Sequence, residues 1–293
     1  MSIGMQNEIR RPICFCADGN YARFVVPAIE SIERADPEGK YEYHVISDME
    51  MSAEIISALK VFISLDRLSW HIIDPGRYSA LREVHHFTRA MYYRLSIPDV
   101  IDADIVLYLD CDVLVRKPLA YLFDLDLTGY YIAAVANPFF TRDLVSSEDY
   151  FNSGVMVVNC RKWKSEGVAA RAIKMIAEYG DRLDMPDQDA LNMVFGGGWY
   201  RLAFKYNSQM SCFLRLGEGE VPADMICDPI IVHFSSSNKQ WHRSCPLIFV
   251  KEYKSLSSAF FVAKRNTIFD VLIRVVKGGY FKWVKKNPFF SPW

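Results

Sequence analysis

Two spacings of apolar residues alternate along most of the chain. Short continuous apolar runs are separated by longer stretches in which apolar residues return every three or four positions, as Val25, Val26, Ile29 and Ile32 do. A continuous run bounded by polar residues predicts a buried strand, and the longer spacing predicts a helix with one buried face. The predicted strands are Ile13–Ala17, Tyr41–Ser47, Ser69–Ile73, Ile105–Leu109, Tyr131–Val135, Gly154–Asn159 and Ile230–Val232. The predicted helices are Arg23–Ala35, Ser52–Phe62, His86–Ser96, Val168–Tyr179 and Gln188–Phe195.

This alternation predicts an α/β fold with a Rossmann-like, mostly parallel central sheet that helices cover on both faces. The helix that begins at His86 should end before Pro98, because proline interrupts helical hydrogen bonding. Neither an internal repeat nor a low-complexity linker interrupts the sequence before Cys245. We therefore expect one domain over residues 1–246 and a separate tail over residues 247–293.

The distribution of charge also separates the tail from the rest. The whole chain has a formal net charge of −1, whereas Leu247–Trp293 contains nine Lys or Arg and two acidic residues, a net charge of +7, which leaves −8 on the first 246 residues. Thr267–Lys277 has one apolar and one polar helical face, and aromatic residues alternate with lysines after Gly279. This pattern is typical of a segment that lies on an anionic membrane. A last helix packed on the domain, or a contact between subunits, is the alternative.

The composition narrows the class of protein. Hydrophobic residues make up 51% of the chain and the net charge is close to zero, which argues against a disordered protein and against one that coats nucleic acid. The cysteines form no CxxC pair, so we expect reduced thiols in a cytoplasmic protein. The N-terminal residues contain no apolar signal segment, and no apolar run reaches the about 18 residues of a spanning helix. We expect a cytoplasmic protein that is peripheral on the inner face of the cytoplasmic membrane. The cysteines are Cys14, Cys16, Cys111, Cys160, Cys212, Cys227 and Cys245.

Two aspartates interrupt an apolar stretch after the predicted strand Ile105–Leu109. Asp110 and Asp112 are followed by Val113-Leu114-Val115. In an extended chain residues i and i+2 point to the same side, so both carboxylates can face one point while Cys111 faces away. Two hard oxygen ligands suit Mg²⁺ or Mn²⁺ and leave positions for the phosphate oxygens of a substrate. A pair of solvated turn residues is the alternative, although two acids among apolar residues are costly unless something neutralises them.

A second group of candidates follows the predicted strand Ile230–Val232. His233 stands at the end of that strand, where its imidazole can supply a third metal ligand. Lys239 offers a positive charge to a phosphate oxygen, and the serine-rich segment between them supplies hydroxyl and backbone N–H donors for a diphosphate. A histidine here is also compatible with a purely structural role.

Two more polar clusters each allow two interpretations. Asp187-Gln188-Asp189 begins a helical pattern, so its acids either contact a substrate or simply favour the positive end of a helix. Asn152 and Ser153 lie between Phe151 and Gly154, and this polar break is either part of a site or an ordinary turn.

Taken in order, these segments resemble glycosyltransferase family 8, the retaining GT-A family that contains bacterial lipopolysaccharide galactosyl- and glucosyltransferases. The resemblance runs from about Ile13 to Cys245. Six segments carry it: Ala17–Tyr21, Thr88–Leu95, Leu107–Val115 with its two aspartates, Tyr150–Trp163, Asp187–Asn192 and His233–Cys245.

The resemblance implies a site for a UDP-sugar and a divalent cation. The uridine would contact the side chains of Asp18 and Asn20, the backbone of Cys16 and Ala17, and the ring of Tyr21. The metal, Mn²⁺ or Mg²⁺, would be held against the diphosphate by Asp110, Asp112 and His233. Lys239 would take a phosphate oxygen. Cys111 and Ser236 complete the implied donor-binding residues at the diphosphate.

The same resemblance places a second set of residues around the transferred sugar, namely Arg94, Asn152, Ser153, Asp187 and Gln188. Arg94, Asp187 and Gln188 are the implied catalytic residues. Breaking the anomeric C–O bond leaves negative charge on UDP, which a cation and a lysine stabilise, whereas acids and amide oxygens favour the oxocarbenium-like centre. We expect Gln188 to stabilise that transition state, because an amide is a poor nucleophile.

The chain departs from the usual family pattern at three places. Asn137 stands near a position that is usually acidic, Asp18-Gly19 replaces a pair of acids, and His233–Trp241 reads HxxSxxKQW in place of HxxGxxKPW. A side chain at Ser236 could therefore crowd the diphosphate.

The interpretation favoured by the sequence is an enzyme that transfers galactose or glucose from a UDP-sugar to a glycan or glycolipid acceptor, such as the lipopolysaccharide core. It needs no nucleic-acid partner. Two alternatives stay open at this point: a nucleotidyltransferase, although no GxxxxGK[ST] loop is present, and a non-catalytic module that binds sugar nucleotides.

Overall fold

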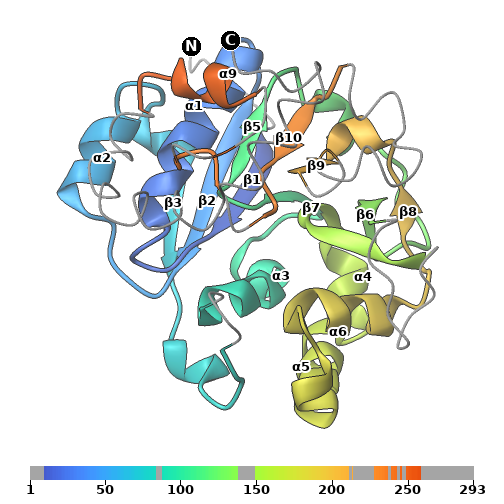
Figure 1. Cartoon of the computed structure of the whole chain (residues 1–293). Helices are drawn as coiled ribbons and strands as arrows, with labels where there is room; N and C mark the ends of the chain where they lie inside the picture. The colour runs from blue at the N-terminus through green and yellow to red at the C-terminus, as the bar shows by residue number, and fades with distance from the viewer. Residues whose placement is uncertain are drawn as a thin grey trace, which may run out of the picture.

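The computed structural model describes residues 10–83, 88–137, 149–210, 213, 228–236, 239–242, 245 and 249–258. Within them a seven-stranded sheet forms the centre of the molecule, in the order β3-β2-β1-β4-β7-β6-β8 (Figure 1). Its strands are β1 (Arg11–Cys16), β2 (Tyr41–Ser47), β3 (Leu68–Ile72), β4 (Ile105–Leu109), β6 (Ile132–Ala136), β7 (Phe151–Asn159) and β8 (Tyr200–Arg201).

The strand directions confirm the predicted mostly parallel sheet. β1 pairs in parallel with β2 and β4, β2 with β3, and β6 with β8, whereas β7 runs antiparallel to its two neighbours. Because β1 and β4 are parallel neighbours, the loops that follow them meet at one edge of the sheet, where open α/β sheets bind their ligands.

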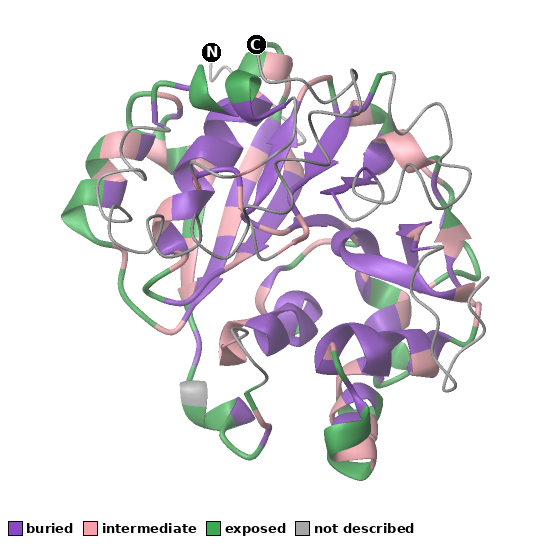
Figure 2. Ribbon diagram, viewed as in Figure 1, coloured by how far each residue is buried: buried purple, intermediate pink, exposed green. Residues whose placement is uncertain are grey.

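Helices cover both faces of this sheet, as predicted. Alternate residues of each strand point to opposite faces, so Ile13 and Leu107 join the hydrophobic core under α1 and α2, while Cys14 and Tyr108 join the core under α3–α6. The central strands β1, β4, β6 and β7 are almost entirely buried, whereas the outer strands β3 and β8 are half-buried to exposed. α2 and α5 expose their outer sides (Figure 2). The helices are α1 (Val25–Ala35), α2 (Ala53–Leu59), α3 (Ile97–Val100), α4 (Cys160–Ser165), α5 (Val168–Tyr179), α6 (Pro186–Phe195) and α9 (Val250–Lys254).

Short 3-10 helices make several of the connections between these elements. The described ones are Ala22–Phe24, Leu65–Arg67, Pro75–Tyr78, Arg89–Ser96, Ala120–Phe123, Gly180–Arg182 and Phe204–Tyr206.

A second, smaller sheet lies beside the large one. Its strands are β5 (Val113–Val115), β9 (Ser208–Gln209) and β10 (Ile231–His233), with β10 in the middle, antiparallel to β5 and parallel to β9. All three residues of β5 and of β10 are buried. Only β10 had a counterpart among the predicted separate strands, since two- and three-residue strands are too short for apolar spacing to reveal.

Two boundaries differ from the predictions. The segment before Gly154 is not a turn: β7 begins at Phe151 and carries Asn152 and Ser153 within it, with a register irregularity opposite Ala134 and Val135. The predicted helix His86–Ser96 begins outside the described residues, and its described part is a 3-10 helix that leads directly into α3. Pro98 does not stop this helix, because it occupies the first turn of α3, where its missing N–H costs nothing.

The last described residues pack on the first helix of the domain. The carboxylate of Glu30 in α1 is completely buried, and it accepts hydrogen bonds from the backbone N–H and hydroxyl of both Ser257 and Ser258, at 2.5 to 2.8 Å. In α9, Glu252 pairs with Arg116 at 2.9 Å. The beginning of the predicted tail is thus attached to the domain, while the amphipathic segment Thr267–Lys277 lies outside the described residues.

The cysteines and the helices agree with two expectations from composition. Cys14, Cys111 and Cys160 are buried free thiols and Cys16 is a half-buried one, while Cys212 and Cys227 lie outside the described residues. Burial raises the pKa of Cys160 to about 12, so this thiol is unreactive at neutral pH. In the described part of the chain, every helix is too short or too polar to cross a membrane.

Candidate active site

The turn Asp110-Cys111-Asp112 connects the large sheet to the small one. β4 ends before this turn and β5 begins after it, so the expectation of one extended stretch from Leu107 to Val115 is wrong. Two backbone hydrogen bonds hold the turn: the N–H of Asp110 donates to Gly154 O at 2.8 Å, and the carbonyl of Asp112 accepts from Phe234 N–H at 3.0 Å. The second of these bonds places the turn against the end of β10.

Both carboxylates of this turn meet His233, the last residue of β10. Its Nε2 lies 3.2 Å from Oδ1 of Asp112 and 3.6 Å from Oδ2 of Asp110. One ligand atom from each of the three residues lies within 4.8 Å of the others. His233 is only 3% exposed and Asp112 7%, so any ion bound between them would be largely shielded from water.

Lys239 binds the other oxygen of Asp112. Its half-buried ammonium contacts Oδ2 of Asp112 and lies 3.1 Å from the carbonyl oxygen of Phe234. Burial alone would raise the pKa of Asp112, but the charge of Lys239 and the contact with His233 outweigh it and hold that pKa well below its usual range. Burial likewise opposes the charge of Lys239, yet Asp112 raises the pKa of the ammonium above its ordinary value. Both groups are therefore ionised at neutral pH.

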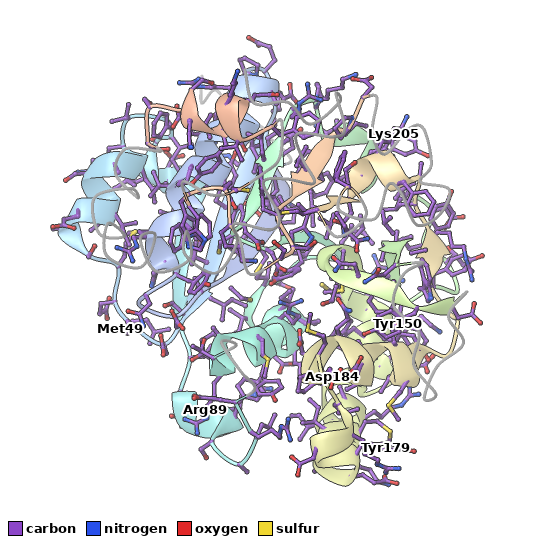
Figure 3. All side chains as sticks on the ribbon, viewed as in Figure 1. Met49, Arg89, Tyr150, Tyr179, Asp184 and Lys205 are labelled. Atoms are coloured by element: carbon purple, nitrogen blue, oxygen red, sulfur yellow. The ribbon has the colours of Figure 1, made fainter. Side chains whose placement is uncertain are left out.

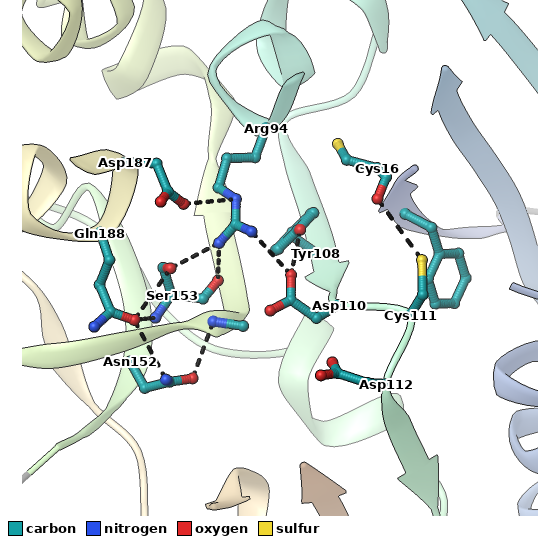
Figure 4. A network of polar contacts seen from close by, with 12 residues as sticks. Cys16, Arg94, Tyr108, Asp110, Cys111, Asp112, Asn152, Ser153, Asp187 and Gln188 are labelled. Carbon is teal, nitrogen blue, oxygen red and sulfur yellow. Dashed lines mark hydrogen bonds and ion pairs between the residues drawn. The ribbon is translucent and has the colours of Figure 1, made fainter. Parts of the chain in front are cut away.

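Arg94 pairs with Asp110 in the same way that Lys239 pairs with Asp112 (Figure 4). Its Nη2 donates to Oδ1 of Asp110 at 3.0 Å, its Nη1 donates to the hydroxyl of Ser153 at 2.7 Å, and its Nε lies 3.2 Å from Oδ2 of Asp187. Burial raises the pKa of Asp187, and the charge of Arg94 only partly opposes this effect. One buried guanidinium thus joins the turn, β7 and the start of α6.

The polar residues in the first turn of α6 have two roles: some face the cleft, and one binds the backbone at the start of the helix. Gln188 points to β7, where its Oε1 accepts the Ser153 N–H at 2.9 Å and its Nε2 donates to the hydroxyl of Tyr150 at 2.9 Å. Tyr150 lies between the start of β7 and α6 (Figure 3). Asp189 accepts from the backbone N–H of Met185 at 3.0 Å, so it has the capping role, whereas Asp187 and Gln188 face the cleft.

The loop after β1 forms another wall of the cleft. Cys16, Ala17 and Tyr21 line it, but the carboxylate of Asp18 faces its own loop. Oδ1 of Asp18 accepts the backbone N–H groups of residues 20 and 21 at 2.9 Å each, and Oδ2 accepts the hydroxyl of Thr88 at 2.6 Å. Asn20 is exposed and lies outside the lining.

Most of the predicted site residues line one cleft. They are Cys16, Ala17, Tyr21, Arg94, Asp110, Cys111, Asp112, Asn152, Ser153, Asp187, Gln188, His233 and Lys239. Ser236 is not among them, because its hydroxyl faces Met210 Sδ at 3.2 Å. Ser235 lines the cleft instead, with a buried hydroxyl that has no hydrogen-bond partner within the described structure. In this structure the side chain of Ser236 therefore does not face the cleft.

Three polar residues of the site were missed by the sequence reasoning. Thr88 binds Asp18, the hydroxyl of Tyr108 donates to Oδ1 of Asp110 at 2.5 Å, and Oδ1 of Asn207 lies 3.0 Å from Nδ1 of His233. Tyr108 lies two residues before Asp110 on a strand, so the period of two could have revealed it. Asn207 precedes a two-residue strand and gave no such signal.

Comparison with known proteins agrees with this architecture. The family model described as "Glycosyl transferase family 8" matches residues 12–245. General stress protein A of Bacillus subtilis is 31% identical over 87% of this chain and 95% of its own length. The lipopolysaccharide 1,3-galactosyltransferase of Salmonella typhimurium is 28% identical over 78% of this chain and 72% of its own.

A solved structure shows the same fold with bound sugars. The galactosyltransferase LgtC, in complex with donor and acceptor sugar analogues, superposes with a TM-score of 0.75 at 25% identity, over 84% of this chain and 94% of that one. The likeness covers most of both chains and shows that this chain has the GT-A fold. A family match that spans the cleft and both sheets identifies this chain as a member of glycosyltransferase family 8.

Proposed function

We propose that this glycosyltransferase moves galactose or glucose from a UDP-sugar to a glycan acceptor, with retention at the anomeric carbon and with the help of a divalent cation. The observation that carries the proposal is the way the two carboxylates divide their oxygens. Asp110 and Asp112 each give one oxygen to a positively charged side chain and turn the other toward Nε2 of His233.

This donor set fits a divalent cation. Carboxylate oxygens and an imidazole nitrogen suit Mn²⁺ and Mg²⁺, and the three ligand atoms are close enough to share one ion. Among the described residues, three buried or half-buried carboxylates, those of Asp110, Asp112 and Asp187, face the two cationic side chains of Arg94 and Lys239. A bound divalent cation would remove this excess of negative charge, and it would also neutralise the charge that develops on UDP as the sugar leaves.

The residues around the proposed cation would act at the two ends of the breaking bond. Lys239 offers its ammonium to a phosphate oxygen and so stabilises the leaving UDP. On the sugar side, the carboxylate of Asp187 and the amide oxygen of Gln188 favour a positively charged anomeric centre. The Ser153 N–H fixes the position of that amide oxygen, and Arg94 fixes the position of Asp187. We assign the uridine to Cys16, Ala17 and Tyr21, which line the cleft, in a loop that Asp18 holds through the N–H groups of Asn20 and Tyr21. We assign the sugar also to Asn152 and Ser153.

UDP release tests this proposal. The protein is incubated with Mn²⁺ and a panel of UDP-sugars, with and without truncated core oligosaccharides, and released UDP is measured. We expect UDP-galactose or UDP-glucose to be used, and both EDTA and Asp110→Ala to abolish turnover. Asp104→Ala is the matched control, because Asp104 is exposed before the opposite end of β4 and pairs with Arg161. Full activity in metal-free buffer would contradict the mechanism.

The proposed acceptor is the lipopolysaccharide core or another bacterial surface glycan. The named activity of the Salmonella relative supports this choice. A truncated core oligosaccharide should therefore increase UDP release well above the rate with water alone. A panel of acceptors in which only protein hydroxyls were glycosylated would exclude it.

We further propose that residues 1–246 form the catalytic domain and that residues 247–293 attach it peripherally to the inner face of the cytoplasmic membrane. The net charge of +7 and the aromatic residues of this segment support the proposal. The contacts of Glu30 with Ser257 and Ser258 tie the segment to α1, so a membrane-bound tail would keep the domain close to a glycolipid acceptor.

A further inference from the structure

The imidazole of His233 has a different neighbour at each nitrogen. Nδ1 lies 3.0 Å from Oδ1 of Asn207, whereas Nε2 faces the carboxylates of Asp110 and Asp112. A neutral imidazole carries one N–H and one lone pair. Which nitrogen carries the hydrogen therefore decides whether Nε2 can bind a cation.

The orientation of Asn207 follows from a backbone group that can only donate. The N–H of Gly154 donates to Oδ1 of Asn152 at 3.0 Å, and the amide nitrogen of Asn207 lies 2.9 Å from the same oxygen. If the Asn207 amide were reversed, two oxygen atoms would face each other at that distance. Asn207 must therefore turn its nitrogen to Asn152 and its oxygen to His233.

A second backbone N–H fixes Asn152 independently. Nδ2 of Asn152 lies 3.3 Å from Oε1 of Gln188, and that oxygen accepts the N–H of Ser153 at 2.9 Å. Asn152, Asn207 and His233 are 7%, 0% and 3% exposed, so bulk water offers no competing partners. The peptide groups of β7 thus determine the direction of every hydrogen bond up to the imidazole.

Because Oδ1 of Asn207 can only accept, Nδ1 of His233 carries a hydrogen, and the neutral ring therefore keeps its lone pair on Nε2. We propose that Asn207 is a positioning residue that holds His233 in this tautomer, so that Nε2 stays open to the cation. This inference depends on the proposed function for one assumption, that a cation binds Nε2 through this lone pair. Without Asn207, the ring can adopt the other tautomer and donate from Nε2 to Asp112 at 3.2 Å. That hydrogen would occupy the place of the cation.

Two measurements on the full chain test this role. The tautomer of His233 is read from ¹⁵N–¹H correlations of histidine-labelled, metal-free protein at a pH where the ring is neutral, with His233→Gln to assign the signal. Mn²⁺ affinity is measured by EPR of free Mn²⁺ with saturating UDP. In Asn207→Leu we expect the hydrogen to move to Nε2 and the Mn²⁺ affinity to fall about 10- to 100-fold. Ser208→Ala, a buried change on the same chain segment that leaves His233 untouched, should change neither.

The outcomes separate this role from the proposed function. An Nε2–H tautomer in the unsubstituted protein overturns the proposal whether or not any variant folds. A folded Asn207→Leu variant with an unchanged tautomer and unchanged Mn²⁺ affinity overturns it as well. If the unsubstituted protein shows the Nδ1–H tautomer but binds no Mn²⁺, the positioning role is supported and the metal-dependent function fails.

Discussion

Gly154 leaves the space that the ring of His233 occupies. A Cβ atom on Gly154 would lie 2.2 Å from Cε1 of His233 and 2.7 Å from Oδ2 of Asp110. The ring of His233 is buried, and Asp110 is held by Arg94 through its other oxygen, so both neighbours resist displacement. We expect Gly154→Ala to destabilise the protein by about 1–3 kcal/mol, the usual cost of overpacking, and to weaken Mn²⁺ binding. Urea unfolding and Mn²⁺ titration measure the two effects.

A double-mutant cycle identifies the ring as the cause. The His233→Ala background removes the closest contact of the added methyl group and leaves the one with Oδ2 of Asp110, so Gly154→Ala should then cost less. Additive losses in the double variant would show that the clash lies elsewhere.

Lys239 should distinguish a diphosphate from a nucleoside. Its half-buried ammonium already neutralises Asp112, and we place it against a phosphate oxygen of UDP. Lys239→Met should weaken UDP binding about 10- to 100-fold, as expected for a charge-assisted hydrogen bond, and should leave uridine affinity unchanged. Isothermal titration with both ligands checks this, with Lys205→Met as a control, since Lys205 lies over the ring of Tyr206 and outside the cleft lining. Equal losses for UDP and uridine would argue against a phosphate contact.

Arg94 should resist replacement by lysine. Its planar guanidinium reaches Asp110, Ser153 and Asp187 at once, and a lysine ammonium cannot reproduce this geometry. We expect Arg94→Lys to lower kcat at least tenfold for every UDP-sugar. Arg94→Met, which leaves two carboxylates without their partner, should also reduce stability by about 3–5 kcal/mol. Wild-type kcat in Arg94→Lys would show that only the charge matters.

Glu30 makes stability depend on pH. Burial alone would raise its pKa, but the hydrogen bonds from Ser258 and Ser257 outweigh burial and lower it. A carboxyl group whose pKa is lower in the folded state than the ordinary value of about 4.3 stabilises the fold fully above that value, and the stabilisation disappears as pH falls through the folded pKa. Glu30→Gln should therefore cost about 1–3 kcal/mol at pH 7.

Urea unfolding at pH 7, 4.5 and 3.5 measures this effect. The difference between Glu30→Gln and the unsubstituted protein should be constant down to about pH 4.5 and should shrink at pH 3.5. The exposed Glu38→Gln serves as the control and should show a small difference throughout. A penalty for Glu30→Gln that did not change with pH would mean that the charge of Glu30 is irrelevant.

The structure also decides where the tail should be cut. Removal of everything after residue 246 would delete α9 and the serines that satisfy Glu30. Truncation after Ser258 keeps these contacts and still removes seven of the nine basic residues. We expect this variant to lose binding to vesicles that contain phosphatidylglycerol and to keep UDP-sugar hydrolysis. Unchanged co-sedimentation with the vesicles would refute the proposed membrane role.

A helix or strand could be predicted from the sequence when its pattern of apolar residues was long enough. α1, α5 and every strand of the large sheet except the two-residue β8 were found, because their apolar spacing extends over several residues. α4 was not found, since its six residues bury only Cys160 and Trp163 and its start depends on the side chain of Asn159. The start of β7 looked like a turn, because Asn152 and Ser153 are polar, yet their side chains are satisfied by α6 and Arg94.

The site followed the same rule. Asp110, Asp112 and His233 were brought together from motifs that lie more than a hundred residues apart in the chain, whereas Asn207 was missed because only the folded chain shows which side chain stands behind a histidine. The turn between β4 and β5 was also missed, because Val113-Leu114-Val115 reads equally well as a continuation of β4.

That turn has a consequence for how the protein holds together. Asp110 follows β4 of the large sheet, whereas Asp112 precedes β5 and His233 ends β10 in the small sheet. An ion bound by all three residues would therefore link the two sheets. Metal binding would then do more than prepare the chemistry: it would raise the resistance of the small sheet to unfolding, with the logarithm of the ratio of ion concentration to dissociation constant.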